Sequence, residues 1–397
     1  MSNLQPPTSD LHIERIELRL VRMQLKAPFR TSFGTEHERE CIIVSVHGGG
    51  LTGWGECVAS RGFAADPFRA TTGTGGASRL DWHLYSYETT VTAWHILRDF
   101  LVPQVLGRPL SIDDMVDAGQ QLRGHPLARA GLEAALWDLT AQLEGIPLSR
   151  ALGGTRERVS VGVSVGIQPS YEALVDTVDA YLAQGYRRIK IKIKPGYDLE
   201  AVKRIRAKHP DILLQVDANS AYTLADAPLF EAMDEHKLLL IEQPLGWDDL
   251  YEHSKLQPRL RTPICLDESI HSLGHARLAI ELGAARVINI KAGRVSGFTE
   301  SRRIHDLCQS RGVPVWCGGM LETGIGRAGN VALASLPNFT LPGDVSASDR
   351  YFHEDIVDPP FTLNSDSTIS VPISPGLGVA VNLTRLDAVT VRREAFV

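Results

Sequence analysis

The chain has 397 residues, 43% of them apolar and 22% charged, with a formal net charge of −6. This composition is ordinary for a soluble globular protein, and the lack of a basic arm argues against a nucleic-acid partner. By length we expect two domains, one of which has room for a barrel of ~250 residues.

The sequence contains no apolar run near the ~20 residues of a membrane span, and residues 1–10 lack the pattern of a signal peptide. The five cysteines are widely spaced and form no Cys-x-x-Cys pair. They therefore indicate reduced thiols in a cytoplasmic protein. Cys265 and Cys317 lie in apolar runs and are expected to pack in the core.

The first third of the chain predicts a small α+β domain. Apolar and polar residues alternate at 11–25 and 41–47, which predicts antiparallel strands. Residues 27–35, which carry Phe29 and Phe33, predict a loop, and the Gly- and Thr-rich residues 59–80 predict a long mobile one. Helical spacing follows at 88–101, 111–123 and 126–143.

From residue 158 on, short runs of branched aliphatic residues alternate with segments of helical length. This alternation predicts parallel strands and helices that close into a barrel. The predicted strands are 159–165, 187–194, 212–217, 238–242, 263–267, 286–291 and 313–317, with a weaker eighth at 339–341. The predicted helices are 171–184, 198–208, 223–233, 248–257, 272–282, 297–311 and 325–335.

Four residues, Lys192, Asp217, Glu242 and Asp267, follow one another at intervals of 25 residues, and Lys291 comes 24 residues later. Each ends an apolar run, so all five side chains are expected at the barrel mouth, where strand ends converge. Three converging carboxylates, with oxygen ligands only, predict a Mg²⁺ or Mn²⁺ site. For any one of them, a solvated or ion-paired carboxylate is the alternative.

Three lysines, Lys190, Lys192 and Lys194, alternate with isoleucines, so the lysines should face the barrel interior. The charge of Lys190 is expected to disfavour protonation of Lys192 and make it a base. Arg294 is expected to keep Lys291 partly deprotonated by repulsion, the alternative being a surface residue at a helix start. Two lysines flanking a metal-bound carboxylate suit removal of its α-proton.

Five motifs together carry a family resemblance: Lys190-Ile-Lys192, Asp217-Ala-Asn219, Ile241-Glu-Gln-Pro244, Asp267-Glu-Ser269 and Asn289-Ile-Lys291. In them the chain resembles the enolase superfamily and its muconate-lactonising branch. Residues 161–166, 214–219, 314–320, 322–324 and 338–344 are similar to the o-succinylbenzoate synthase / N-acylamino acid (N-succinylamino acid) racemase family.

The resemblance implies an α/β protein with a modified TIM barrel, (β/α)₇β, under an α+β capping domain. Residues 1–128 would form the cap, 129–360 the barrel, and 361–397 a tail that packs back on the cap. It implies Mg²⁺, which Mn²⁺ could replace, on the three carboxylates, with Lys192 and Lys291 as the acid/base pair.

The resemblance also implies roles around that core. Lys190 and Asn219 would help bind the substrate carboxylate or complete the ligand shell. Arg294 and Glu268 would act indirectly, through the metal ligands and the lysines. The side of the pocket that receives the succinyl or acyl group would be lined by Ser164, Gly318, Gly319 and Met320. Phe29 and Phe33 would belong to a mobile capping loop. For Ser164, Met320, Phe29 and Phe33, simple packing is the alternative.

The implied activity is dehydration to o-succinylbenzoate in menaquinone synthesis, racemisation of N-succinyl or N-acyl amino acids, or both, since both begin with the same proton removal. The partners would be a small-molecule carboxylate and further copies of the chain. A cycloisomerase or dipeptide epimerase is the alternative enzyme, although residues 341–344 lack the Asp-x-Asp of the latter. A non-catalytic binding or structural barrel is the third alternative, although all the lysines and all the proposed metal ligands are present.

Two features depart from the family pattern. Residues 61–80 look longer than the usual second capping loop, and Lys194 stands where an acidic residue is common. The longer loop would change the shape of the lid, and with it the substrate preference. Lys194 would change the charge near the barrel mouth.

Overall fold

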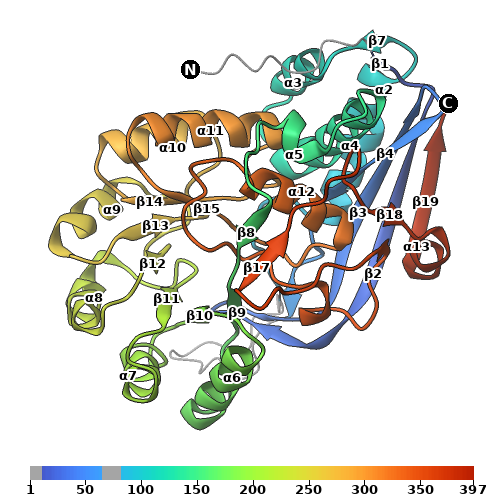
Figure 1. Cartoon of the computed structure of the whole chain (residues 1–397). Coiled ribbons are helices and arrows are strands. Elements are labelled where there is room, and N and C mark those ends of the chain that lie inside the picture. Colours follow the sequence, from blue (N-terminus) through green and yellow to red (C-terminus); the bar gives the residue numbers. More distant parts are fainter. Residues whose placement is uncertain (1–10, 65–81) are drawn as a thin grey trace.

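The computed structural model describes residues 11–64 and 82–397. A barrel ringed by helices lies beside a domain built on an antiparallel sheet (Figure 1). Most of the loop predicted at 59–80 and the N-terminal residues 1–10 fall outside the described residues. Among the helices described, none is long and apolar enough to cross a membrane.

A long antiparallel hairpin, β2 (Arg15–Arg30) with β3 (Thr35–Gly48), forms the centre of the capping domain, and β4 (Leu51–Cys57) pairs with β3. Helix α4 (Pro126–Leu143) packs closely on β4, and this approach requires glycine at residue 55. A Cβ atom there would lie 2.2 Å from the carbonyl oxygen of Gly131. The other elements are β1 (Leu11–His12), β5 (Phe63–Ala64), β6 (Trp82–His83), α1 (Thr90–Ile96), a π-helical turn (Leu97–Leu101), α2 (Val102–Val105), β7 (Pro109–Leu110), α3 (Ile112–Gln120) and α5 (Leu148–Ala151).

The loop predicted at 27–35 is wrong over most of its length. Strand β2 runs on to Arg30, and Phe29 pairs with Glu36 on β3, so only residues 31–34 turn. The ladder register shifts between Gln24 and Phe29. Pro28 lies within this interval and has no N–H for the ladder, which is why the sequence loses its strand signal there.

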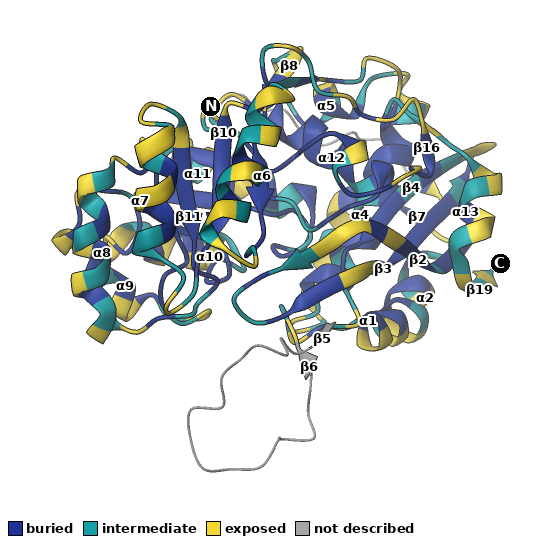
Figure 2. Ribbon diagram, turned by 90° about the horizontal axis from the view of Figure 1, so that it is seen from below, coloured by how far each residue is buried: buried dark blue, intermediate teal, exposed yellow. Residues whose placement is uncertain are grey.

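Seven parallel strands form the barrel sheet in the order β15-β14-β13-β12-β11-β10-β9. They are β9 (Val163–Val165), β10 (Arg188–Lys192), β11 (Leu213–Asp217), β12 (Ile241–Glu242), β13 (Ile264–Leu266), β14 (Val287–Ile290) and β15 (Val315–Cys317). The helices are α6 (Tyr171–Ala183), α7 (Leu199–Lys208), α8 (Ala227–Met233), α9 (Tyr251–Leu256), α10 (Leu273–Glu281), α11 (Phe298–Ser310) and α12 (Gly324–Ala334). Figure 2 shows the strands buried and the outer faces of the helices exposed.

The barrel differs from prediction at both ends. The first predicted strand, 159–165, is two strands, because β8 (Arg158–Ser160) pairs antiparallel with β17 (Thr368–Ser370) and only β9 enters the barrel. The predicted eighth strand, 339–341, is not regular. Single parallel bridges instead join Phe339 to Val315 and Gly343 to Val161, so this segment closes the ring between β15 and β9.

The C-terminal tail completes the cap sheet. Strand β19 (Thr390–Phe396) pairs antiparallel with β2 and lies beside the blue strands in Figure 1, as predicted for the tail. Before it come β16 (Val357–Asp358), β18 (Ala380–Val381) and α13 (Leu383–Val389). The domain boundaries after residues 128 and 360 stay predictions. Cys265 and Cys317 are buried, as predicted, and all five cysteines are free thiols.

A buried carboxylate joins the cap to the barrel. Glu56 on β4 accepts hydrogen bonds at the start of α12, from Thr323 Oγ1 at 2.7 Å and from the Thr323 and Gly326 amides at 3.1 Å. Burial raises the pKa of Glu56 to about 7, helped by the charge of Glu322 and opposed by the bonds from Thr323. The joint therefore holds a carboxyl group that loses its proton near neutral pH.

We predict that Glu56→Gln changes how stability depends on pH. A raised folded-state pKa means that the stability from the protonated carboxyl is complete below about pH 4.5 and is lost as the pH rises through 7. The variant should therefore gain about 2–3 kcal/mol over the parent between pH 5 and pH 8, measured by urea unfolding. Glu14→Gln, at an exposed position, is the control. Parallel profiles for parent and Glu56→Gln would contradict the prediction.

Candidate active site

The five regularly spaced residues lie together at the carboxyl ends of five adjacent strands. Lys192, Asp217 and Glu242 are the last residues of β10, β11 and β12, and they pair in register. Asp267 and Lys291 directly follow β13 and β14. All five are buried. The strand-end placement predicted from the sequence is therefore what the structure has.

The two outer lysines are each bound to a carboxylate on a neighbouring strand. The Lys192 amine lies 2.6 Å from Asp217 and donates to Asn219 Oδ1 at 2.8 Å. The Lys291 amine lies 2.7 Å from Asp267, which also pairs with the guanidinium of Arg294. The alternative of a surface position for Arg294 is wrong, because this side chain is buried and donates to the carbonyls of residues 270 and 289.

The inner lysine, Lys190, is surrounded by carboxylates. Its amine lies 2.5 Å from Asp344, 2.9 Å from Glu242 and 3.2 Å from Asp217. It also lies 5.0 Å from the ring centre of Trp316. Arg188, fully buried one layer below, pairs with Asp344 at 2.7 Å. A charge this deep in a barrel is tolerated because it is matched on several sides.

These pairs set the proton affinities of the site. Burial alone would raise the pKa of Asp217, but Lys192 and Lys190 outweigh it and the pKa lies below its ordinary value. Burial and the charge of Asp217 raise the pKa of Glu242. Burial alone would lower the pKa of Lys291, but Tyr85, Glu268 and Glu242 outweigh it. The expectation that Arg294 keeps Lys291 partly deprotonated is therefore wrong for this structure.

The carboxylates are arranged here as ion pairs. Among the described residues, no three Asp, Glu, His or Cys side chains form a group that could hold a metal ion. The donor set itself, three buried carboxylates from adjacent strand ends, suits a hard divalent cation. Nearby, Glu268 Oε2 is buried without a hydrogen-bond partner. By the chemistry of their oxygens, though not by the present arrangement of the side chains, these donors fit Mg²⁺.

A cavity of about 70 Å³ lies between the barrel mouth and the cap. Its lining brings together most of the predicted substrate-binding residues and both acid/base candidates: Phe29, Phe33, Ser164, Lys190, Lys192, Asn219, Lys291, Gly319 and Met320. Gly318 does not line it, but a Cβ atom there would lie 2.7 Å from the Lys291 side chain. The Ser164 hydroxyl is buried without a partner, which favours direct contact with a ligand over packing.

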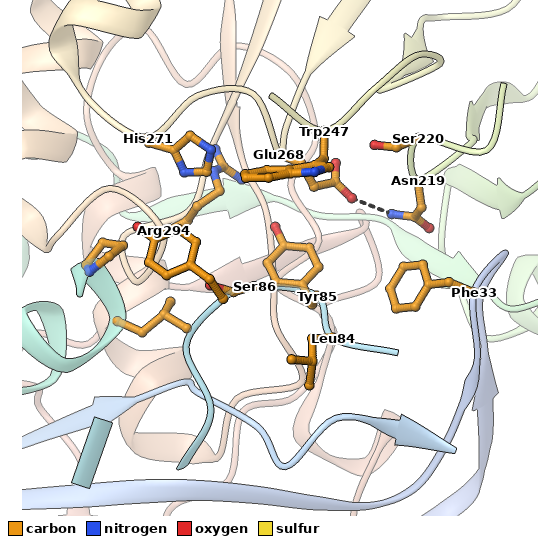
Figure 3. A pocket seen from close by; sticks show the side chains of 13 residues that line it. Phe33, Leu84, Tyr85, Ser86, Asn219, Ser220, Trp247, Glu268, His271 and Arg294 are labelled. Atoms are coloured by element: carbon orange, nitrogen blue, oxygen red, sulfur yellow. Dashed lines mark hydrogen bonds between the residues drawn. The ribbon is translucent and has the colours of Figure 1, made fainter. Parts of the chain in front are cut away.

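A second, outer cavity of about 340 Å³ adjoins the first and is drawn in Figure 3. Arg294 and Glu268 lie in its wall, and Asn219, which lines both cavities, donates to Glu268 Oε1 at 2.9 Å. From the cap come Phe33 and Tyr85, which also line both cavities. The two cavities therefore share one wall.

Sequence reasoning missed two residues of the site. Tyr85 contacts both Lys291 and Asp267, but it stands directly after the Gly-rich segment, where no pattern marks a site. Asp344 lies in a segment, 338–344, that resembles the family, but the sequence assigns it no role in the site. Its place in the sequence, shortly after the last predicted strand, could have marked it as a strand-end carboxylate.

The fold and the site together define a class of protein: a capped barrel with buried lysines and carboxylates at the mouth, which is the usual site of enzyme chemistry in barrels. The chain matches the family model for the mandelate racemase / muconate lactonizing enzyme N-terminal domain over residues 15–153. It matches the enolase C-terminal domain-like model over residues 173–385. The protein is therefore an enzyme of the enolase superfamily.

Close relatives narrow the class. The chain is 48% identical over 382 residues to an o-succinylbenzoate synthase from Geobacillus kaustophilus, covering 96% of each chain. It is 47% identical over 382 residues to an N-succinylamino acid racemase from Amycolatopsis sp, covering 96% of this chain and 98% of the relative. A crystal structure of an enolase superfamily member from Listeria innocua Clip11262 superposes with a TM-score of 0.88 at 36% identity, covering 98% and 99%. The chain belongs to the o-succinylbenzoate synthase / N-succinylamino acid racemase family.

We predict that Asp344→Asn is strongly destabilising. Asp344 is buried between Arg188 and Lys190, so the change leaves two buried cations poorly compensated. Breaking such a pair costs about 3–5 kcal/mol, measurable by urea unfolding. The matched control is Asp366→Asn, which breaks the exposed pair with Arg158 and should leave stability unchanged. Equal stabilities for the two variants would show that the buried pair is unimportant.

Proposed function

We propose that this enzyme removes the α-proton of a carboxylate substrate that bears a succinyl or acyl group, using Mg²⁺ and a pair of lysines. The products would be o-succinylbenzoate, by dehydration, or the mirror-image N-succinyl or N-acyl amino acid, by racemisation. The observation that carries the proposal is the placement of Lys192 and Lys291. Their strands flank the three carboxylate strands, and both side chains line the same cavity.

The residues that would hold the ion are Asp217, Glu242 and Asp267. When bound, Mg²⁺ (or Mn²⁺) would neutralise the substrate carboxylate and the charge that develops on it as the proton leaves. Asn219 and Lys190 would help orient that carboxylate. Arg294 would act on the site through its pair with Asp267.

For racemisation, one lysine acts as a neutral amine and the other as an ammonium. The α-carbon–hydrogen bond breaks, its proton goes to the amine, and the electron pair enters the enediolate. The opposite ammonium then returns a proton to the other face, which inverts the centre. For dehydration, the electron pair of the enediolate instead expels the β-hydroxyl group, which takes a proton from the lysine that removed the α-proton and leaves as water. Dehydration therefore needs one lysine as base, whereas racemisation needs both.

The acyl end of the substrate would lie toward the cap. Ser164 offers a buried hydroxyl without a partner, suited to a polar group. Gly319 and Met320 complete this side of the cavity, and Phe29 and Phe33 close it from the cap hairpin. A lid role for this hairpin is supported by its reach, since Ser32 Oγ lies 3.4 Å from the carbonyl oxygen of Asn219 on the barrel.

We also propose a substrate class, a cellular compartment and association with further copies of the chain. Small-molecule carboxylates are the substrates that the relatives' names indicate, and the buried free thiols are consistent with a reducing, cytoplasmic setting. Association with further copies is supported by two exposed apolar side chains, Leu278 on α10 and Leu282 directly after it.

We predict that Lys192→Ala and Lys291→Ala each lower racemisation of N-succinyl amino acids by about 10³-fold or more, the scale of a general acid/base group. Each variant should still exchange the α-proton of one enantiomer with D₂O, and the two should retain opposite enantiomers. ¹H NMR in D₂O with Mg²⁺ measures both. Lys203→Ala, exposed on α7, is the control. Loss of both exchanges in either variant would contradict the division of labour.

We predict that Arg294→Met slows racemisation by about tenfold, while dehydration stays within about threefold. The reason is that Arg294 shares Asp267 with Lys291, and racemisation needs both lysines to move a proton whereas dehydration needs one. The α-proton assay and an absorbance assay for o-succinylbenzoate give the two rates. Equal slowing of both reactions would show that Arg294 acts on the whole site and not through Lys291.

A further inference from the structure

A tyrosine of the capping domain reaches the lysine on one side of the mouth. The Lys291 amine donates to Tyr85 Oη at 3.1 Å and lies 4.8 Å from the centre of the Tyr85 ring. The Tyr85 hydroxyl donates to Asp267 Oδ1 at 3.2 Å. Burial raises the pKa of Tyr85, although Lys291 and Arg294 oppose it, so the group is a neutral phenol that donates and accepts at once.

The segment that carries Tyr85 is fixed to helices of the cap. Glu88 accepts from the Leu127 and Ala128 amides, at 2.7 and 3.1 Å, at the first turn of α4. The Glu88 amide donates to Ser86 Oγ at 3.2 Å, which closes the turn. Residue 89 then caps α1. Figure 3 shows Tyr85 among the side chains that line the outer cavity, and it forms part of the wall shared with the inner one.

The two lysines of the mouth are held in different ways. Lys192 hydrogen-bonds to Asp217, the last residue of β11, and to Asn219, two residues further on. From the cap, the centre of the Phe29 ring lies 6.0 Å from the Lys192 amine. In the described part of the chain, the Lys291 amine hydrogen-bonds to Asp267 and to Tyr85. Asp267 is a proposed metal ligand, so Tyr85 is the contact that stays available to Lys291 when that carboxylate is engaged. Among the described residues, the hydrogen bonds of Lys192 thus come from the barrel, whereas the cap supplies one of those of Lys291.

We propose that Tyr85 is the positioning residue of Lys291, and that the cap thereby assists proton transfer on one face of the substrate only. This inference rests on the proposed two-lysine function and adds to it a residue outside the barrel. The hydroxyl accepts from the Lys291 amine and takes no proton itself. The proton moves between the α-carbon and the Lys291 nitrogen, as in the mechanism above.

The test is α-proton exchange of each enantiomer of an N-succinyl amino acid in D₂O with Mg²⁺, for the intact protein, Tyr85→Phe, Lys192→Ala and Lys291→Ala. The lysine variants assign each enantiomer to one lysine. Tyr85→Phe keeps the ring and removes the oxygen, so exchange at the Lys291 face should fall at least about tenfold. Exchange at the Lys192 face should stay within about twofold. Tyr251→Phe, exposed on α9, removes the same atom elsewhere and should match the parent.

A second measurement separates Lys291 from Asp267, which Tyr85 also touches. Titration calorimetry with Mg²⁺ should give the same affinity for Tyr85→Phe and the parent. Equal slowing of both faces, a weaker Mg²⁺ affinity, or no slowing at all would each overturn the role of Tyr85 and leave the proposed function standing. A parent protein that exchanges neither enantiomer would instead overturn the proposed function, and the role of Tyr85 with it.

Discussion

Everything at the barrel mouth depends on the pairing of buried charges at adjacent strand ends. Burying an unpaired charge is costly, and these strands bring cations and carboxylates into a dry layer where each has a partner. The lower part, in which Asp344 joins Arg188 to Lys190, stabilises the buried charges. The upper part, Lys192 with Asp217 and Lys291 with Asp267, holds the same oxygens that would bind a divalent ion. The proposed acid/base lysines and the proposed metal ligands are thus coupled by charge.

The capping domain completes the site above these buried charges. It covers part of the mouth with the hairpin tip that carries Phe33 and with the turn that carries Tyr85, so the charges lie beside a small cavity between cap and barrel. The joint at Glu56 ties β4 to the start of α12, which fixes the cap relative to the barrel. In the part of the chain that the structure describes, a cap residue hydrogen-bonds to the Lys291 amine and none hydrogen-bonds to the Lys192 amine, so the two faces of the site differ.

The strand ends were predictable because a fixed spacing and apolar runs are local signals. Lys192, Asp217, Glu242 and Asp267 needed nothing more than strand order to be brought together. The contacts of Arg294, Asp344 and Tyr85 were not predictable, because each depends on how distant segments meet. The hairpin over 27–35 was missed since Pro28 interrupts the alternation, and the first barrel strand was divided by pairing with the far C-terminal tail.

The most direct test of the account is a crystal structure with Mg²⁺ and an N-succinyl amino acid bound. We expect the ion on Asp217, Glu242 and Asp267. Lys192 and Lys291 should then be released from their carboxylates and face opposite sides of the α-carbon. An ion bound elsewhere, or an α-carbon with both lysines on the same side, would contradict it.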